Sequence, residues 1–403
     1  MTISSVEAEV IERGLTRRGF LKFCAAMAAA LALPPAFSER IAYALEAPKR
    51  TPVVWLEMQD CAGCSEAFLR ASRPTAAEIV LDVLSVDYHE TIMAASGNLA
   101  EEAKQKTIEA GGYLLVVEGS ISTADDGVYC CIGGKTSIDL LQEAASKALA
   151  IVAVGSCAAF GGIPRAAPNP TGAVSVMDLV KNKPVLNLAG CPYNVVNLTA
   201  TVVHFLTFGE LPAMDALHRP LFAYGALIHD NCERRGHFDA GQFVREWGDE
   251  GHRKGWCLYQ MGCKGPLTYH NCPAVRYNDG VSWPVGAGHG CIGCSEPDFW
   301  ELGVYKTAAI QKVAPPVSYA PVQQPEQKIP SSSAALMGGL IGLAIGAASA
   351  AAYSQLSKQE TPAAETPAGA ETPAVAAEAP AGAETLATAA PDDKADNPPA
   401  AKT

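Results

Sequence analysis

Three short apolar runs of this sequence each end just before a cysteine, and this feature limits the possible fold most. The runs are residues 53–58, followed by Cys61 and Cys64; residues 151–154, followed by Cys157; and residues 185–188, followed by Cys191. Short β-rich runs that alternate with helical stretches, as between residues 51 and 215, predict a parallel sheet covered on both faces. The carboxyl ends of such strands border one crevice, so the four cysteines are predicted to converge there.

Four thiols at one sheet edge suit more than one kind of site. Zinc accepts four thiolates, and so does an iron–sulfur cluster. A Cys-x-x-Cys after a first strand is also typical of thioredoxin-like redox sites. Neither zinc nor a redox pair accounts for Cys157 and Cys191 at equivalent strand ends, which favours an iron–sulfur cluster. Glu66 and Glu118 lie near the same edge, where a solvated or helix-capping role is expected.

The second half of the chain offers two more groups of ligands. From residue 221 to about 313 the alternation stops, and Gly, Asn, His and Cys accumulate, which is typical of a domain organised around metal. A spacing of three residues puts His229 and Cys232 on one face of a helical turn. The first group comprises His229, Cys232, Cys257 and Cys263. The second group has three thiols and no evident fourth, and comprises Cys272, Cys291 and Cys294.

Three separate metal groups in one chain indicate electron conduction. All 13 cysteines except Cys24, Cys130 and Cys131 fall into these groups, which a disulfide framework would not explain. The adjacent pair Cys130 and Cys131 is expected to be small buried apolar residues. No catalytic-triad, phosphate-binding or dinucleotide motif competes, and a net charge of −12 argues against a nucleic-acid partner. The remaining histidines considered lack ligand spacing and are expected to be structural or to support ligands: His237, His252, His270 and His289.

The beginning of the chain predicts export. Arg17-Arg18 before an apolar run is typical of the twin-arginine route, which moves folded proteins. An A-x-A cleavage pattern follows at residues 42–44, and cleavage after Ala47 is equally consistent. Residues 1–47 are therefore predicted to be a signal peptide.

The end of the chain predicts a membrane anchor. Residues 334–353 carry no charge over 20 positions, about the length that a helix needs to cross a bilayer. Glycines recur on one face at Gly338, Gly342 and Gly346, where a second helix could pack closely. A buried soluble helix is the alternative. Residues 354–403 are rich in Ala, Pro and Glu and are predicted to be disordered.

These motifs together resemble the small subunit of membrane-bound, periplasm-facing nickel–iron hydrogenases. The matching stretches are residues 61–66, 118–120, 155–157, 190–192, 229–238, 254–266 and 283–297. The resemblance implies a flavodoxin-like domain over residues 51–215 and a cluster domain over residues 216–315, with a linker at 316–333. It assigns a proximal [4Fe–4S] cluster to Cys61, Cys64, Cys157 and Cys191.

The same resemblance assigns the other two groups. A distal [4Fe–4S] cluster would use His229, Cys232, Cys257 and Cys263, and a medial [3Fe–4S] cluster would use Cys272, Cys291 and Cys294. Pro284 stands where relatives with a four-iron medial cluster have a cysteine. Gly63 and Gly162 stand where oxygen-tolerant members carry two extra cysteines, which predicts an oxygen-sensitive enzyme.

The resemblance also implies function and partners. Hydrogen would be oxidised at a nickel–iron centre in a large subunit, and this chain would carry the electrons to a membrane cytochrome (b-type or multihaem c-type) and a quinone. The folded part would lie on the periplasmic side of the cell membrane, with the span at 334–353 among lipids. Two alternatives stay open: the one-cluster subunit of a quinone-reducing respiratory complex, and a zinc-stabilised structural membrane protein.

Overall fold

The computed structural model describes residues 17–45, 50–72, 75–76, 79 and 83–309. The predicted linker, membrane span and tail lie outside these ranges, as do the first 16 residues of the predicted signal peptide. None of the helices in the described ranges is long and apolar enough to cross a bilayer. The boundary predicted between residues 215 and 216 falls in the loop that follows residue 208 and precedes residue 221.

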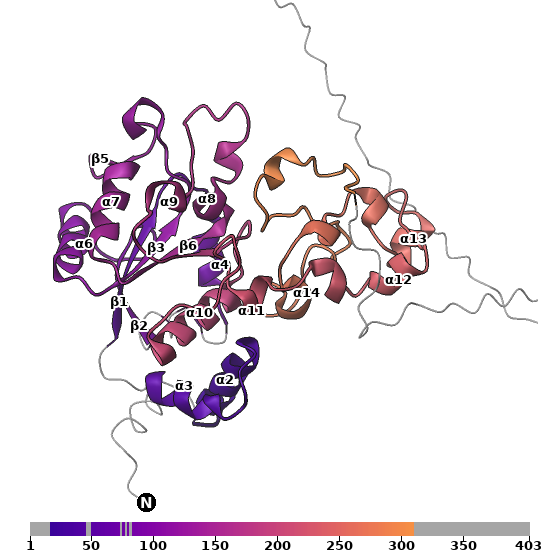
Figure 1. Ribbon diagram of the computed structural model, residues 1–403, viewed down its shortest axis with the longest axis horizontal. Helices are drawn as coiled ribbons and strands as arrows, with labels where there is room; N and C mark the ends of the chain where they lie inside the picture. Colours follow the sequence, from indigo (N-terminus) through magenta and orange to yellow (C-terminus); the bar gives the residue numbers. More distant parts are fainter. Residues whose placement is uncertain (1–16, 46–49, 73–74, 77–78, 80–82, 310–403) are drawn as a thin grey trace, which may run out of the picture. The chain divides into compact units, whose positions relative to one another are not determined.

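Five strands form a parallel sheet in the order β2-β1-β3-β6-β7 (Figure 1). This is the strand order of flavodoxin-like folds, and the predicted parallel α/β class is confirmed. Strands β3, β6 and β7 are buried at every position, as expected for strands covered on both faces. The strands span Thr51–Glu57 (β1), Leu84–His89 (β2), Leu114–Glu118 (β3), Ala150–Val154 (β6) and Val185–Leu188 (β7).

Helices cover both faces of this sheet. Alternate residues of β1 point to opposite faces, so that Val54 and Leu56 join one apolar core while Val53 and Trp55 join the other. The first core is completed by α6 (Asn98–Ala110), α7 (Ser137–Lys147) and α9 (Val176–Leu179). The second is completed by α4 (Gly63–Leu69), α10 (Val195–Phe208) and α11 (Leu221–Tyr224).

Local sequence fixes where several of these helices begin. The hydroxyl of Thr136 accepts the backbone N–H of Asp139 at the start of α7, and Asn194 accepts that of Val196 at the start of α10. Ser175 and Asp178 form a reciprocal capping box at α9. Other helical segments between the strands include α8 (Gly155–Phe160) and the 3-10 turns η2 (Ala124–Gly127) and η3 (Ile163–Arg165).

Only short helical segments occur between residues 221 and 309, a stretch that is fully described. They have three to five residues each, and the apolar core they surround contains several of the cysteines. This half is therefore loop-rich, as predicted. Besides α11 the segments are η4 (Ile228–Asn231), α12 (Arg235–Asp239), α13 (Glu250–Arg253), η5 (Tyr259–Met261), η6 (Gly265–Leu267), α14 (Cys272–Val275) and η7 (Phe299–Glu301).

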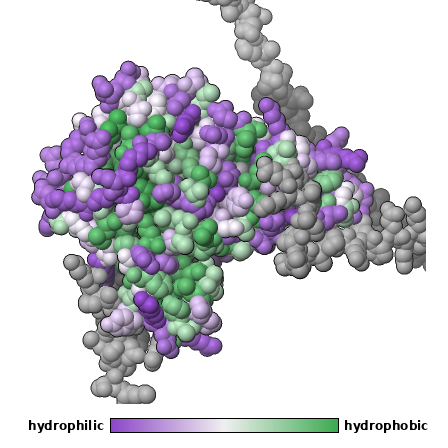
Figure 2. All heavy atoms as spheres, in the orientation of Figure 1, coloured by the Kyte–Doolittle hydropathy of each residue, from purple (hydrophilic) through white to green (hydrophobic). Residues whose placement is uncertain are grey.

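The described part of the predicted signal peptide folds into two helices, α2 (Arg17–Ala30) and α3 (Phe37–Leu45). Four buried residues, Cys24, Met27, Ala28 and Leu31, follow the spacing of one helix face, and they pack with α10. Figure 2 shows a largely apolar surface over α2 and α3, whereas hydrophilic residues dominate over α6. The A-x-A pattern at residues 42–44 lies inside α3, so cleavage there requires this helix to unfold locally.

This packing predicts that a charged side chain on the buried face of α2 detaches this helix from α10. In full-length protein, Ala28→Asp should raise the rate of Cys24 alkylation at least tenfold, because a buried unpaired carboxylate costs roughly 2 kcal/mol or more. Ala26→Asp puts the same charge on the exposed face of the same helix and should leave the rate unchanged. The rate is read by mass spectrometry of the tryptic peptide that contains Cys24. Equal rates in both variants would contradict the packing.

Candidate metal centres

The register of the parallel sheet lines up its strand ends. Glu57 at the end of β1 pairs with Glu118 of β3, Glu118 with Val154 of β6, and Val154 with Leu188 of β7. Residues that follow these positions in sequence therefore emerge at one edge. The lengths of the loops that follow the strands then determine which side chains lie close together at this edge.

The four predicted proximal cysteines lie at this edge. Cys61 follows β1, Cys64 lies in α4, Cys157 lies in α8 directly after β6, and Cys191 follows β7. Burial, then Glu118, Cys157 and Cys191, raise the pKa of Cys64 well above its ordinary value. Burial and Cys191 raise the pKa of Cys157 to about 12, with a smaller contribution from Cys61. The thiol of Cys191 thus lies close to those of Cys64, Cys157 and Cys61, so the structure brings the four cysteines together.

Glycines make room for these sulfur atoms. A Cβ atom on Gly155 would lie 2.5 Å from the sulfur of Cys64, and one on Gly162 would lie 2.5 Å from the sulfur of Cys157. Gly63 is in a similar position, with its missing Cβ 3.2 Å from the sulfur of Cys61. Both positions singled out for extra cysteines, Gly63 and Gly162, therefore border the proximal thiols.

Glu118 caps the helix that carries Cys64. Its carboxylate accepts the backbone N–H groups of Cys64 (3.0 Å) and Ser65 (3.2 Å), the Ser65 hydroxyl (2.7 Å) and the Trp55 indole N–H (3.3 Å). Ala62 provides no side-chain cap, so this neighbouring strand supplies the missing acceptor. The predicted capping role of Glu118 is thus confirmed, although the residue is buried. Glu66 is solvated and pairs with Arg70 at 2.7 Å.

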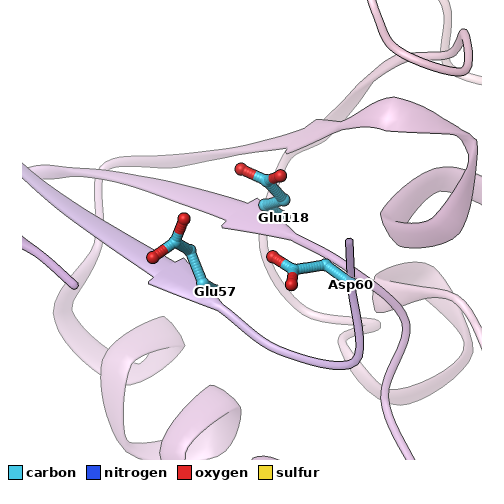
Figure 3. Close-up of side chains that lie close together, drawn as sticks. All are labelled: Glu57, Asp60 and Glu118. Carbon is cyan, nitrogen blue, oxygen red and sulfur yellow. The ribbon is translucent and has the colours of Figure 1, made fainter. Parts of the chain in front are cut away.

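Two further carboxylates meet Glu118 at this edge and were not expected from the sequence. Oxygen atoms of Glu57, Asp60 and Glu118 lie within 4.8 Å of one another (Figure 3). Burial, then the charge of Glu57, raises the pKa of Asp60 to about 6, and burial also raises the pKa of Glu118. The acidic residue Glu57 within the apolar run at residues 53–58 was the signal that could have found this group.

The four predicted distal ligands line one cavity. His229 lies on the turn η4, and the thiols of Cys232, Cys257 and Cys263 face the same space. The Nε2 atom of His229 is buried and has no hydrogen-bond partner in the described part of the chain. Burial, then Arg235, lowers the pKa of this imidazole to about 4. A neutral ring with a free nitrogen is the form that binds metal.

The three predicted medial cysteines share a second cavity, of about 520 Å³. Cys272, Cys291 and Cys294 line it together with Pro284 and the proximal residue Cys191. Burial raises the pKa of all three thiols, to about 11 for Cys294. A buried polar group needs a partner, and metal ligation would satisfy these sulfur atoms.

Hydrogen bonds join neighbouring sites to each other. The backbone N–H of Cys291, a medial residue, donates to the sulfur of Cys263, a distal residue, at 3.2 Å. The hydroxyl of Ser156 accepts the N–H of Gly190 at 2.9 Å and donates to the carbonyl of Cys294. Ser156 and Gly190 precede the proximal residues Cys157 and Cys191. The medial site therefore contacts the loops of both other sites.

A buried lysine lies beside the distal and medial thiols. Lys264 is 2% exposed, and its ammonium donates to the carbonyls of Gly262 (2.7 Å), Lys306 (2.5 Å) and Val304 (3.4 Å). Burial lowers the pKa of Lys264, and the nearby thiols of Cys263 and Cys291 partly offset this shift. Sequence reasoning missed this residue, although its position next to Cys263 was a signal.

The two unassigned cysteines of the first half lie away from these sites. Cys130 is half-buried against the first core, but Cys131 is exposed, so the prediction that both are buried is wrong for Cys131. The reason is a hairpin between β4 (Cys131–Ile132) and β5 (Lys135–Thr136), with a turn at Gly133 and Gly134. Successive residues entering such a hairpin point to opposite sides.

Comparison with known proteins identifies the family. The profile of the C-terminal domain of the NiFe/NiFeSe hydrogenase small subunit matches residues 224–305, and that of the NADH ubiquinone oxidoreductase 20 Kd subunit matches residues 61–205. The Hydrogenase-2 small chain of Escherichia coli K12 is 44% identical over 352 residues, which cover 86% of this chain and 94% of that one. The chain belongs to the hydrogenase small subunit family.

Other hydrogenase small subunits agree with this assignment. The quinone-reactive Ni/Fe-hydrogenase small chain of Wolinella succinogenes is 50% identical over 294 residues, which cover 72% of this chain and 83% of that one. A solved [NiFeSe]-hydrogenase chain from Desulfomicrobium baculatum has a TM-score of 0.61 and 37% identity, and the match covers 64% of this chain and 100% of that chain. Small subunits of this family pair with a large subunit that holds the catalytic site.

The glycine contacts predict a specific loss at the proximal site. Gly155→Ala should prevent metal from binding at this site, because the new methyl group would lie 2.5 Å from the Cys64 sulfur. Gly134→Ala is the matched control, since Gly155 and Gly134 have φ of 83° and 81° but Gly134 has open space around it. Iron per mole of purified heterodimer should fall in the first variant only. An equal fall in both would mean that backbone strain, and not the sulfur contact, is responsible.

Proposed function

We propose that electrons pass through this small subunit from a nickel–iron centre, at which the large subunit oxidises hydrogen, to an acceptor in the membrane. The observation that supports this most is the continuity of the three sites. Proximal Cys191 neighbours medial Cys294, and medial Cys291 neighbours distal Cys263. A protein that needed metal only for stability would have no reason to arrange its sites in a row.

Iron–sulfur clusters fit the residues present at each site. Cys61, Cys64, Cys157 and Cys191 would hold a proximal [4Fe–4S] cluster, and His229, Cys232, Cys257 and Cys263 a distal one. Cys272, Cys291 and Cys294 would hold a medial [3Fe–4S] cluster, because Pro284 contributes no fourth thiolate. When bound, such clusters supply one-electron redox centres.

The residues of this chain have distinct roles in that proposal. The thiols would provide the ligands. Burial of most of them keeps water away from the distal and medial sites, whereas Cys61 and Cys191 of the proximal site are exposed. The neutral imidazole of His229 binds without adding negative charge to the distal site, which therefore differs from an all-thiolate site. The Lys264 ammonium stabilises the negative charge of the thiolates of Cys263 and Cys291.

We further propose that the mature chain is anchored on the periplasmic side of the cell membrane. The twin-arginine motif at residues 17–18 and the apolar stretch at 334–353 support this location. A membrane cytochrome, b-type or multihaem c-type, is the proposed acceptor, and the name of the quinone-reactive Wolinella relative is consistent with a quinone further on. Co-purification from membranes with a nickel-containing large subunit and a haem protein is the expected result.

The two alternatives make different predictions about metal. The respiratory-complex alternative has support in residues 61–205, but it does not account for the hydrogenase-specific match at residues 224–305. A structural zinc protein would be colourless and contain zinc, whereas the proposal requires iron, acid-labile sulfide and brown absorbance. Metal analysis of the purified protein therefore separates the alternatives.

Removing one distal ligand should interrupt electron delivery. We expect Cys263→Ala to lose the distal centre and to slow acceptor reduction by hydrogen at least tenfold, because the conducting row ends at this site. Cys131→Ala removes an exposed cysteine outside the three sites and should change neither iron content nor rate. Iron analysis and hydrogen-dependent dye reduction measure both effects. A Cys263→Ala protein with wild-type iron and rate would refute the distal assignment.

The glycines at the proximal site predict how the enzyme responds to oxygen. Gly63 and Gly162 border the proximal thiols but add no sulfur of their own, so the two extra cysteines of oxygen-tolerant members are missing there. The proximal centre should therefore show one redox transition, and activity should be lost under air. Redox titration followed by EPR tests this. Detection of three redox states at the proximal centre would contradict the prediction.

A further inference from the structure

One buried histidine contacts a medial thiol without belonging to any ligand set. His270 is 2% exposed, and its Nδ1 atom lies 2.9 Å from the sulfur of Cys272. This contact is shorter than the backbone hydrogen bonds to cysteine sulfur at Cys263 (3.2 Å) and Cys291 (3.4 Å). The polar side chain thus lies directly against the medial site.

The surroundings of His270 determine which nitrogen carries the proton. The Nε2 atom of this ring is buried and has no hydrogen-bond partner among the described residues. A metal-bound thiolate has no proton and can only accept. The proton therefore lies on Nδ1 and is donated to the sulfur of Cys272.

Neighbouring residues hold the ring in this position. The backbone N–H of His270 donates to the carbonyl of Ala226 at 3.2 Å, and the ring packs edge-on against Tyr224 with centroids 4.9 Å apart. The hydroxyl of Tyr224 donates to the carbonyl of Ala189 at 2.7 Å, which fixes that ring in turn. His270 therefore has little freedom to turn away from Cys272.

A buried arginine fixes both medial loops at once. Arg219 pairs with Asp215 at 2.8 Å and with Glu296 at 2.9 Å, and it donates to the carbonyl of Ser295 at 2.8 Å. Glu296 also accepts the backbone N–H of Tyr269 at 2.6 Å. The loop after Cys294 and the segment that carries His270 are thus connected to the same side chain.

We propose that His270 is a positioning residue that raises the reduction potential of the medial centre through an N–H···S hydrogen bond to Cys272. A donor to sulfur stabilises the added negative charge of the reduced state more than it stabilises the oxidised state. This inference rests on the proposed role of Cys272 as a medial ligand. His270 lies outside the ligand set and adjusts the reduction potential of the centre in the middle of the electron path.

Three variants of the intact heterodimer test the proposal. His270→Leu removes the donor, whereas His270→Asn keeps an N–H donor of similar reach. His289→Leu is the matched control, because His289 also stands two residues before a medial cysteine but its Nδ1 contacts the carbonyl of Gly290 and not sulfur. The midpoint potential of the medial centre is measured by redox titration with EPR detection.

We expect His270→Leu to lower the equilibrium constant for reduction about tenfold, which is a shift of 59 mV for a one-electron couple. His270→Asn and His289→Leu should stay near the wild-type potential. An unchanged potential in His270→Leu overturns the proposal, and so does an equal shift in His270→Asn. If Cys272→Ala leaves every EPR signal intact, the ligand assignment itself is wrong and the inference is wrong with it.

A measurement on the wild-type protein covers the case in which His270→Leu does not assemble the medial centre. Protein labelled with ¹⁵N-histidine should show a nitrogen coupling to the paramagnetic medial centre in pulsed EPR, and His270→Asn should lose it. Absence of that coupling in the wild type overturns the proposal without any need for the leucine variant.

Discussion

The structure depends on one geometric constraint, the alignment of strand ends in a parallel sheet. Because every strand runs in the same direction, each following loop begins at the same edge. Cysteines separated by more than a hundred residues in sequence, such as Cys61 and Cys191, are neighbours there. The same edge also positions Glu118, which caps the helix that carries Cys64. The sheet thus positions both the ligands and the residues that hold them.

The second half relies on a different source of order. Its helical segments have three to five residues, too short to be stable alone, and its core includes the sulfur atoms of several ligands. Burial raises the pKa of these thiols, so metal must displace their protons on binding. We infer that metal binding and folding are coupled in this half more strongly than in the sheet domain.

The contacts between sites hold neighbouring sites in place and also place polar groups beside the sulfur atoms. Hydrogen bonds from Cys291 to Cys263 and from Ser156 to the Cys294 carbonyl fix the relative positions of adjacent sites. Lys264 places a positive charge near the thiols of Cys263 and Cys291, and His270 places a ring nitrogen against the thiol of Cys272. If the three sites hold clusters as proposed, different residues of one chain would set their potentials.

The sequence by itself determined the parallel sheet, the three groups of candidate ligands and the family resemblance, because strand periodicity, cysteine spacing and glycines beside cysteines are local patterns. It did not determine the carboxylate group of Glu57, Asp60 and Glu118, the exposure of Cys131, or the contacts of Lys264 and His270. These depend on which loops meet in space. Burial and hydrogen bonding are properties of the folded chain, so only the tertiary structure decided which polar side chains lie against the thiols.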